Sequence, residues 1–216
     1  MRDRAAKQPE DLVRVGDEKH PNMRVWFPDS TFNIPPDAEW QGEKKSDTEM
    51  RFVWESKDIR VIKEITLHPD EFMAIMDVRL ELIGAKAAKQ ALAVSLFSRQ
   101  AREGDEEAGM FTQVERRWKA ACFEDDELKT TSAKSLGKKG EKRRTGDISW
   151  GGFHHAYFLV AASLKPFDDT ADKRIDCNAY PIEGVPGGMG VDLVQPSHEL
   201  KNGEPGLHAK LAFYLG

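Results

Sequence analysis

The sequence has few cysteines, no long apolar run and no excess of positive charge. Two cysteines in 216 residues exclude a disulfide-rich scaffold, and they are too few for a zinc site without help from histidine. The longest apolar stretch, around Tyr157–Ala162, is far shorter than the roughly 20 residues that span a bilayer. Lysine and arginine number 32 against 37 acidic residues, a net charge of −5 that repels nucleic acid. We therefore expect no nucleic-acid partner.

The amino-terminal residues show no charged segment followed by an apolar one, so no signal peptide is visible. The residues alone leave two locations open: the cytoplasm, or a compartment reached through a segment that this sequence does not include. Residues 1–22 are polar and unpatterned, which predicts a loosely held entry to the fold.

Apolar residues alternate with polar ones along several segments, which is the pattern of strands with one buried face. In Phe72–Ile83 one face carries apolar side chains only, while the other includes Asp77, Arg79 and Glu81. Arg60–Leu67 repeats the pattern, and the Pro69-Asp70 pair between the two segments suits a tight connection. The two segments therefore predict a β-hairpin.

Further strands are predicted over shorter segments, and helical patterns are scarce. The predicted strands are Met50–Trp54, Ala91–Arg99, Tyr157–Ser163, Gly190–Val194 and Leu207–Leu215. The best candidate for a short helix is 124–136, and the basic segment 134–147 reads as an exposed loop. The prediction is one domain over 1–216, mainly β, an antiparallel β-sandwich with few short helices. Its inward side chains should be Val61, Ile65, Leu67, Phe72, Met76, Val78, Leu80, Val94, Leu96 and Phe158.

Candidate catalytic residues do not form a recognisable arrangement. His154 and His155 are neighbours whose side chains would point to opposite faces of a strand, so one metal ion could hardly bind both. Ser149 lacks the Gly-x-Ser-x-Gly turn of a nucleophile. The glycines at 184, 187, 188 and 190 match neither a dinucleotide fingerprint nor a phosphate-binding loop. We expect no catalytic, cofactor-binding or metal-binding residues.

An epimerase-like site is the one form of acid–base catalysis that the residues suggest. Sandwich-type sugar epimerases use a histidine and a carboxylate across a cleft, so His155 or His68 with a glutamate would be the residues involved. No spacing in the sequence fixes such a pair.

Three blocks of the sequence resemble the large first periplasmic domain of bacterial YidC, the membrane-protein insertase. They are "FVWESKDIRVIKEITLHPDEFMAIMDVRLEL" (52–82), the series Trp150, Tyr157, Phe158, Ala161 and Pro166 in W-x6-Y-F-x2-A-x4-P spacing, and "LKNGEPGLHAKLAFYLG" (200–216), which ends at Gly216. The second block is the most specific. The family's first periplasmic strands and its membrane-embedded insertase core have no counterpart in this sequence.

The resemblance implies a β-supersandwich of the galactose-mutarotase type at the periplasmic face of the bacterial inner membrane. It implies a non-catalytic accessory domain that supports insertion and folding of inner-membrane proteins. The expected partners are accessory subunits of the Sec translocon or nascent membrane proteins. The motif residues would then be structural aromatics and turn residues rather than a site.

Two other classes of function stay open, a carbohydrate- or peptide-binding sandwich and an epimerase-like enzyme. An extracytoplasmic location would also permit a disulfide between Cys122 and Cys177. Nothing in the sequence shows that the two strands carrying them are neighbours.

Overall fold

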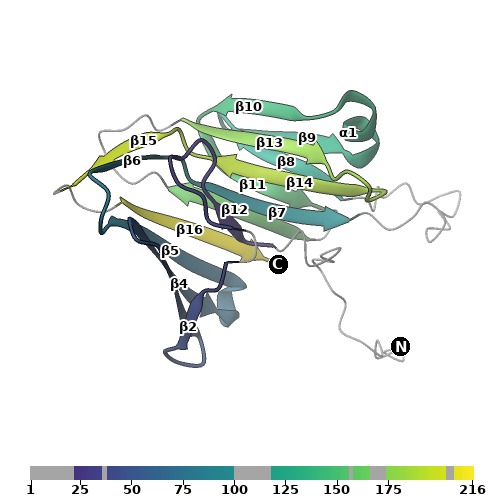
Figure 1. The fold of residues 1–216 in the computed structure, drawn as a ribbon. Coiled ribbons are helices and arrows are strands. Elements are labelled where there is room, and N and C mark those ends of the chain that lie inside the picture. Colours follow the sequence, from purple (N-terminus) through teal and green to yellow (C-terminus); the bar gives the residue numbers. More distant parts are fainter. Residues whose placement is uncertain (1–21, 36–37, 100–117, 156–157, 166–173, 203–206) are drawn as a thin grey trace, which may run out of the picture.

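The computed structural model describes residues 22–35, 38–99, 118–155, 158–165, 174–202 and 207–216, and almost all of them belong to or connect β-strands. Figure 1 shows the arrangement of the strands in layers. The strands are β1 Arg24–Trp26, β2 Gln41–Lys44, β3 Glu49–Glu55, β4 Ile59–His68, β5 Met73–Leu82, β6 Ala87–Gln90, β7 Ala93–Arg99, β8 Lys119–Glu124, β9 Glu127–Ser132, β10 Lys142–Gly146, β11 Ile148–His154, β12 Leu159–Lys165, β13 Ile175–Pro181, β14 Gly188–Val194, β15 His198–Lys201 and β16 Leu207–Leu215. The helical elements are the 3₁₀ turn η1 Pro69–Glu71 and the α-helix α1 Ala133–Lys139.

Two antiparallel sheets pack face to face, with a small third sheet beside them. The larger sheet has nine strands in the order β2-β3-β4-β5-β16-β12-β11-β8-β9, and the smaller has five in the order β1-β7-β14-β13-β10. Strands β15 and β6 form a separate pair. The predicted antiparallel sandwich is therefore confirmed.

The β4–β5 hairpin shows why the alternating sequence produces this fold. The register pairs Val61 with Leu80 and Ile65 with Met76, so inward residues of one strand lie opposite inward residues of the next. Val61 and Leu80 are fully buried, as predicted, and the same holds for Met76, Val78, Val94 and Leu96. Burying each such side chain contributes about 1.5–3 kcal/mol.

Four of the side chains that were predicted to point into the core are exposed or only half-buried. Leu67 is 47% exposed and Phe72 is 62% exposed, while Ile65 and Phe158 are half-buried. Leu67 and Phe72 lie at the η1 end of β4 and β5, which extend beyond the five-stranded sheet (Figure 1). Phe158 precedes β12, so the alternation of that strand does not govern its side chain.

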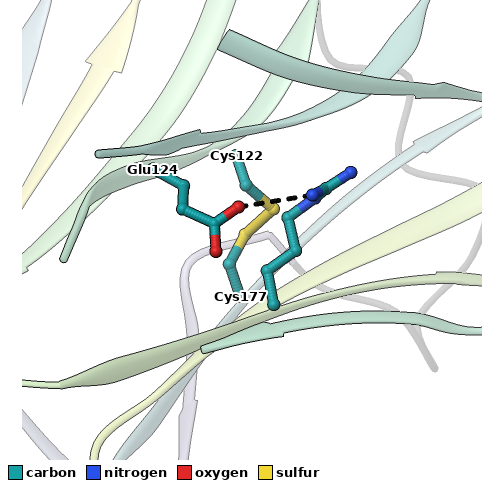
Figure 2. The surroundings of a disulfide bond; sticks show 4 residues. Cys122, Glu124 and Cys177 are labelled. Carbon is teal, nitrogen blue, oxygen red and sulfur yellow. Dashed lines mark hydrogen bonds and ion pairs between the residues drawn. A yellow bond between two sulfur atoms is a disulfide. The ribbon is translucent and has the colours of Figure 1, made fainter. Parts of the chain in front are cut away.

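A disulfide joins the two sheets through the core. Cys122 in β8 and Cys177 in β13 are bonded, with Cα atoms 6.2 Å apart, and both are buried. Figure 2 shows the bond between the layers, with Glu124 beside it. Glu124 forms an ion pair with Arg144 of β10, 3.3 Å apart, so a second contact links the same edge of the two sheets (Figure 2).

The segment 134–147 is not the loop that was predicted. Its first part forms α1, capped by Ser132, whose hydroxyl accepts a hydrogen bond from the amide of Ser135. Its second part is β10, which pairs with β13 along the edge of the five-stranded sheet. The basic side chains are largely exposed, as expected, but the backbone is ordered by capping and strand pairing.

Several boundaries also differ from the prediction. The helix expected over 124–136 is mostly the hairpin of β8 and β9, and a helix begins only at Ala133. Short or glycine-containing strands, such as β2, β10 and β11, escaped the periodicity argument because few alternating apolar positions mark them. Of the segment 1–22, only Asn22 lies inside the described residues.

Candidate functional site

An apolar hollow lies on the outer face of the nine-stranded sheet. It is a groove of about 570 Å³. We call it the aromatic groove, and its lining residues are Leu128, Trp150, His154, His155, Phe158, Leu159, Tyr214 and Gly216. Strands β9, β11, β12 and β16 supply five of these residues, and His155, Phe158 and Gly216 lie just beyond strand ends.

The alternating side chains of β11 show that the groove lies outside the core. A Cβ added to Gly151 would lie 2.8 Å from Leu193 and 2.9 Å from the Sγ of Cys177, so Gly151 faces the five-stranded sheet. Because side chains alternate along a strand, Trp150 faces the opposite way. Tyr214 likewise alternates with fully buried Phe213 and is 38% exposed.

Aromatic rings form the walls of the groove. The rings of Phe123 and Trp150 are stacked 5.8 Å apart at 8°, on the neighbouring strands β8 and β11. At the other end, the His155 ring lies 5.3 Å from Trp118 and 6.1 Å from Phe158. Such ring pairs contribute about 0.5–1.5 kcal/mol beyond the area they bury, so the walls are held before any ligand arrives.

Backbone hydrogen bonds fix the floor of the groove. The amide of His155 donates to the carbonyl of Phe158 at 2.8 Å, where the chain turns from β11 to β12. Leu159 and Gly216 exchange hydrogen bonds in both directions, 2.5 and 3.1 Å long. The end of the chain is thereby tied to β12, beside the exposed Leu128.

The chemistry of the groove is largely apolar, with two imidazoles and no Asp or Glu side chain among its lining residues. Both His154 and His155 border it, contrary to the expectation of opposite faces, because β11 ends at His154 and the next residue leaves the strand. Over the residues whose placement is described, no three His, Cys, Asp or Glu side chains gather as metal ligands. The groove can bind apolar or aromatic groups but presents no acid–base pair.

Charged side chains occupy another part of the same outer face. Glu64 of β4 is paired with Arg79 at 3.0 Å and lies 3.6 Å from Arg51. Next to them, Nε2 of His208 lies 2.7 Å from the carboxylate of Asp77. This is a histidine–carboxylate pair of the kind that an epimerase-like reading requires, but the two groups bind each other directly. A base and an acid that act on opposite sides of a sugar carbon need room for that carbon between them.

The other candidate residues from the sequence analysis lie apart from one another. His68 is exposed at the end of β4, outside the aromatic groove. Ser149 is exposed, and its carbonyl accepts a hydrogen bond from the hydroxyl of Ser163 at 2.9 Å. Gly184 and Gly187 have φ of 72° and 73°, which is the turn role that the sequence indicated.

One buried polar cluster lies on the outward face of the five-stranded sheet. The hydroxyl of Tyr180 donates to the carboxylate of Asp192 at 3.0 Å, and the indole of Trp26 donates to the hydroxyl of Ser95 at 2.9 Å. Burial raises the pKa of Asp192, and burial together with the charge of Asp192 raises the pKa of Tyr180. The cluster satisfies its own groups, as buried polar side chains in stable proteins do.

The motif residues that the structure describes lie at or beside the groove. Trp150, Phe158 and Gly216 line it, and Ala161 lies beside it, directly opposite Gly152 and Tyr214 in the register. Tyr157 and Pro166 fall outside the described residues. Trp150 and Phe158 are therefore walls of a surface groove, where the sequence predicted core or edge aromatics of the sandwich.

Sequence reasoning missed Leu128, Leu159 and Tyr214 as groove residues. The alternation of Leu207–Leu215 carried the signal for Tyr214, since it places the tyrosine on the face opposite Phe213. No signal identified Leu128, because its strand β9 was taken for part of a helix.

Among the helices of the described residues, none has the length and apolar character that crossing a bilayer requires.

Several solved structures share the fold at very low sequence identity. A galactose mutarotase related enzyme from Lactobacillus acidophilus has a TM-score of 0.56 at 8% identity, over 84% of this chain and 72% of that one. A putative aldose 1-epimerase from Escherichia coli K12 has a TM-score of 0.54 at 9% identity, over 82% and 68%. A galactose mutarotase-like protein from Lactobacillus casei has a TM-score of 0.51 at 10% identity, over 84% and 75%. These likenesses confirm the galactose-mutarotase-like sandwich and carry no activity with them.

Sequence comparison gives the family. No curated protein matches the chain. The family model of the YidC periplasmic domain matches residues 8–216, almost the whole sequence. The resemblance in the three sequence blocks is thereby confirmed, and the chain belongs to the YidC periplasmic domain family.

Proposed function

We propose that the chain is a non-catalytic accessory domain of a YidC-type insertase, at the periplasmic face of the bacterial inner membrane. In this proposal the domain supports insertion and folding of inner-membrane proteins. It does so by contacting a partner, either an accessory subunit of the Sec translocon or a nascent membrane protein. The observation that carries the proposal is the family match over residues 8–216.

The aromatic groove supplies the contact surface. Aromatic side chains that are already held in place bind apolar segments at low entropic cost, and they are enriched at recognition surfaces. The half-buried rings of Trp150 and Phe158 and the exposed Leu128 and Tyr214 offer such a surface.

The disulfide supports an extracytoplasmic location. Disulfides persist in oxidising compartments such as the periplasm and are rare in the cytosol. Cys122 and Cys177 are both buried and bonded, as expected of a structural disulfide formed in such a compartment.

Site-specific photocrosslinking in the intact insertase tests the proposal. A photoreactive amino acid replaces Trp150 or Tyr214 in the groove. In a control protein it replaces Phe72, which is 62% exposed in the turn between β4 and β5. We expect adducts with a translocon subunit or a nascent membrane protein from the groove positions during membrane-protein synthesis. Equal adducts from Phe72, or none from the groove, would contradict the proposal.

A carbohydrate-binding sandwich is the second candidate, and the stacked Trp150–Phe123 pair in a mutarotase-like fold favours it. Saturation-transfer NMR with galactose and glucose tests binding, and polarimetry of freshly dissolved α-galactose tests catalysis. Sugar signals that disappear on replacing Trp150 by alanine would favour this candidate. An accelerated rotation change would establish an enzyme.

A further inference from the structure

Four lysines form an exposed basic surface around α1. Lys134, Lys138 and Lys139 lie on the helix and are exposed, and half-buried Lys142 begins β10. We call these four residues the lysine face. In the part of the chain that the structure describes, none of them forms an ion pair or a side-chain hydrogen bond. The arginines that follow differ, because Arg143 is paired with Asp176 and Arg144 with Glu124.

Helix stability accounts for only part of this arrangement. Lys138 and Lys139 occupy the last turn of α1, where a cation offsets the partial negative charge of the helix end. Lys134 lies in the first turn, where a cation is unfavourable, and no acidic residue accompanies it there. Lys142 lies beyond the helix altogether. The fold therefore does not explain the lysine face as a whole.

Among the residues that the structure places, few acidic side chains lie near the lysine face. Glu141 lies within the segment, and Glu183 lies in the turn between β13 and β14. The acidic turn Asp125–Glu127 is at the far end of the β8–β9 hairpin, since Lys119 pairs with Ser132 at the α1 end. A strand of this length spans about 20 Å, beyond the screening length of about 8 Å at physiological salt. The positive potential at α1 is therefore not cancelled from that end.

An open groove of apolar and glycine residues lies directly beside the helix. It has a volume of about 380 Å³ between α1 and the β13–β14 turn, and we call it the proline groove. Its lining includes Ala133, Ile182, Val185 and Pro186. Pro186 is exposed and Val185 is half-buried. Lysines beside a shallow apolar hollow can contact lipid phosphates while the apolar side chains meet the glycerol and acyl region.

We propose that the lysine face and the proline groove dock the domain on an anionic phospholipid surface. The proposal rests on the proposed function only in placing the domain beside a membrane. Charge complementarity selects this occupant: the chain as a whole is acidic, with a net charge of −5, so an anionic bilayer attracts the lysine face and repels the rest. Docking therefore also orients the domain, with α1 toward the headgroups.

Vesicle co-sedimentation of the 216-residue chain tests this docking. The vesicles contain phosphatidylglycerol mixed with phosphatidylcholine, or phosphatidylcholine alone. The test variant K134Q/K138Q/K139Q/K142Q removes the lysine face. The control variant K57Q/K86Q/K89Q/K210Q makes the same change of net charge at exposed lysines elsewhere. Thermal melting verifies that both variants are folded.

We expect binding to the anionic vesicles only, weakened by rising salt. A lysine near an anionic surface is worth about fivefold in affinity, so the test variant should lose more than about tenfold and the control less than about threefold. The variant V185S/P186S should also bind the vesicles more weakly than wild type, with an unchanged salt dependence. Equal losses in the test and control variants would overturn the proposal. So would lysine-dependent binding to soluble polyglutamate with none to vesicles. Crosslinking from the aromatic groove is a separate measurement, so either proposal can fail alone.

Discussion

At the scale of single residues, Gly151 shows how one small residue makes room for the junction of the two sheets. Its position in β11 faces Leu193 and the Sγ of Cys177, both of which would lie under 3 Å from an added Cβ. Its neighbour Gly152 permits a still closer approach, because a Cβ there would lie 2.0 Å from the carbonyl oxygen of Val160 in the adjacent strand. The adjacent glycines of β11 thus reflect close packing rather than a flexible turn.

The variant Gly151→Ala should therefore be destabilised by about 1–3 kcal/mol, the usual cost of overpacking a core. Gly137→Ala in α1 is the matched control, since nothing lies within 4 Å of its added Cβ, and it should gain up to about 1 kcal/mol from helix propensity. Urea unfolding of both variants measures the difference. A stability of Gly151→Ala equal to wild type would show that the core at the disulfide is looser than the structure indicates.

Lys63 is a second residue whose surroundings lead to a measurable effect. Burial, with a smaller contribution from the charge of Arg24, lowers the pKa of Lys63 to about 8 from its ordinary value of 10.5. Its Nζ lies 3.8 Å from the ring centroid of Trp40, a cation–π contact that offsets part of the burial cost.

The pH dependence of folding follows from that lowered pKa. Between pH 8 and 10.5 the unfolded chain binds the proton of Lys63 more readily than the folded one, so the free energy of unfolding rises with pH in this window. Below pH 8 the cost of holding a buried cation is present in full. Lys63→Met should lack this rise, whereas Lys57→Met, at a 90% exposed side chain, should retain it. Urea midpoints at pH 7 and 10 provide the comparison, and parallel curves for wild type and Lys63→Met would contradict the assignment.

At the scale of elements, the contacts between β8, β11 and β13 couple the groove to the core. The strand β11 presents Trp150 outward to the aromatic groove and Gly151 inward to the disulfide. Its neighbour β8 carries Phe123 outward, stacked on Trp150, and Cys122 inward. The disulfide therefore holds in place the strands from which the groove wall is built.

Removing the disulfide should cost about 4 kcal/mol, because the bond closes a loop with a sequence separation of 55 residues. The variant C122A/C177A should unfold at lower urea concentration than wild type. A reductant added to the unfolding series should lower the wild-type midpoint and leave that of the variant unchanged. Two free thiols in denatured, unreduced protein would instead show that the bond does not form.

At the scale of the whole molecule, one hydrophobic core runs through the described chain. The buried cluster extends from Val25 of β1 to Phe213 of β16, and it includes residues of both large sheets. The first and last described strands thus contribute to the same core, which favours one domain over several.

We therefore expect unfolding as a single cooperative transition. Far-ultraviolet circular dichroism reports the strands. Tryptophan fluorescence reports different parts of the fold, through Trp26, Trp40, Trp54, Trp118 and Trp150. Coincident urea curves from the two probes would support one domain. Two separated transitions would show that the β2–β5 end folds apart from the rest.

The sequence by itself determined the class of the fold, its long strands and its family. Period-2 alternation is a local property, so β4, β5, β7 and β16 could be located without knowing their neighbours. The spaced aromatic motif and the two flanking blocks identified the YidC periplasmic family for the same reason, since a pattern of spacing needs no tertiary contact.

Tertiary structure alone decided the pairing of Cys122 with Cys177 and the existence of both surface grooves. Strand order is set by contacts between segments far apart in the sequence, and alternation does not say which strand lies next to which. Trp150 illustrates the consequence. Its apolar character predicted a buried position, but its side chain points away from the core, onto the outer surface of β11. Leu128, Tyr214 and Gly216 become its neighbours only because β9, β11, β12 and β16 assemble into one sheet.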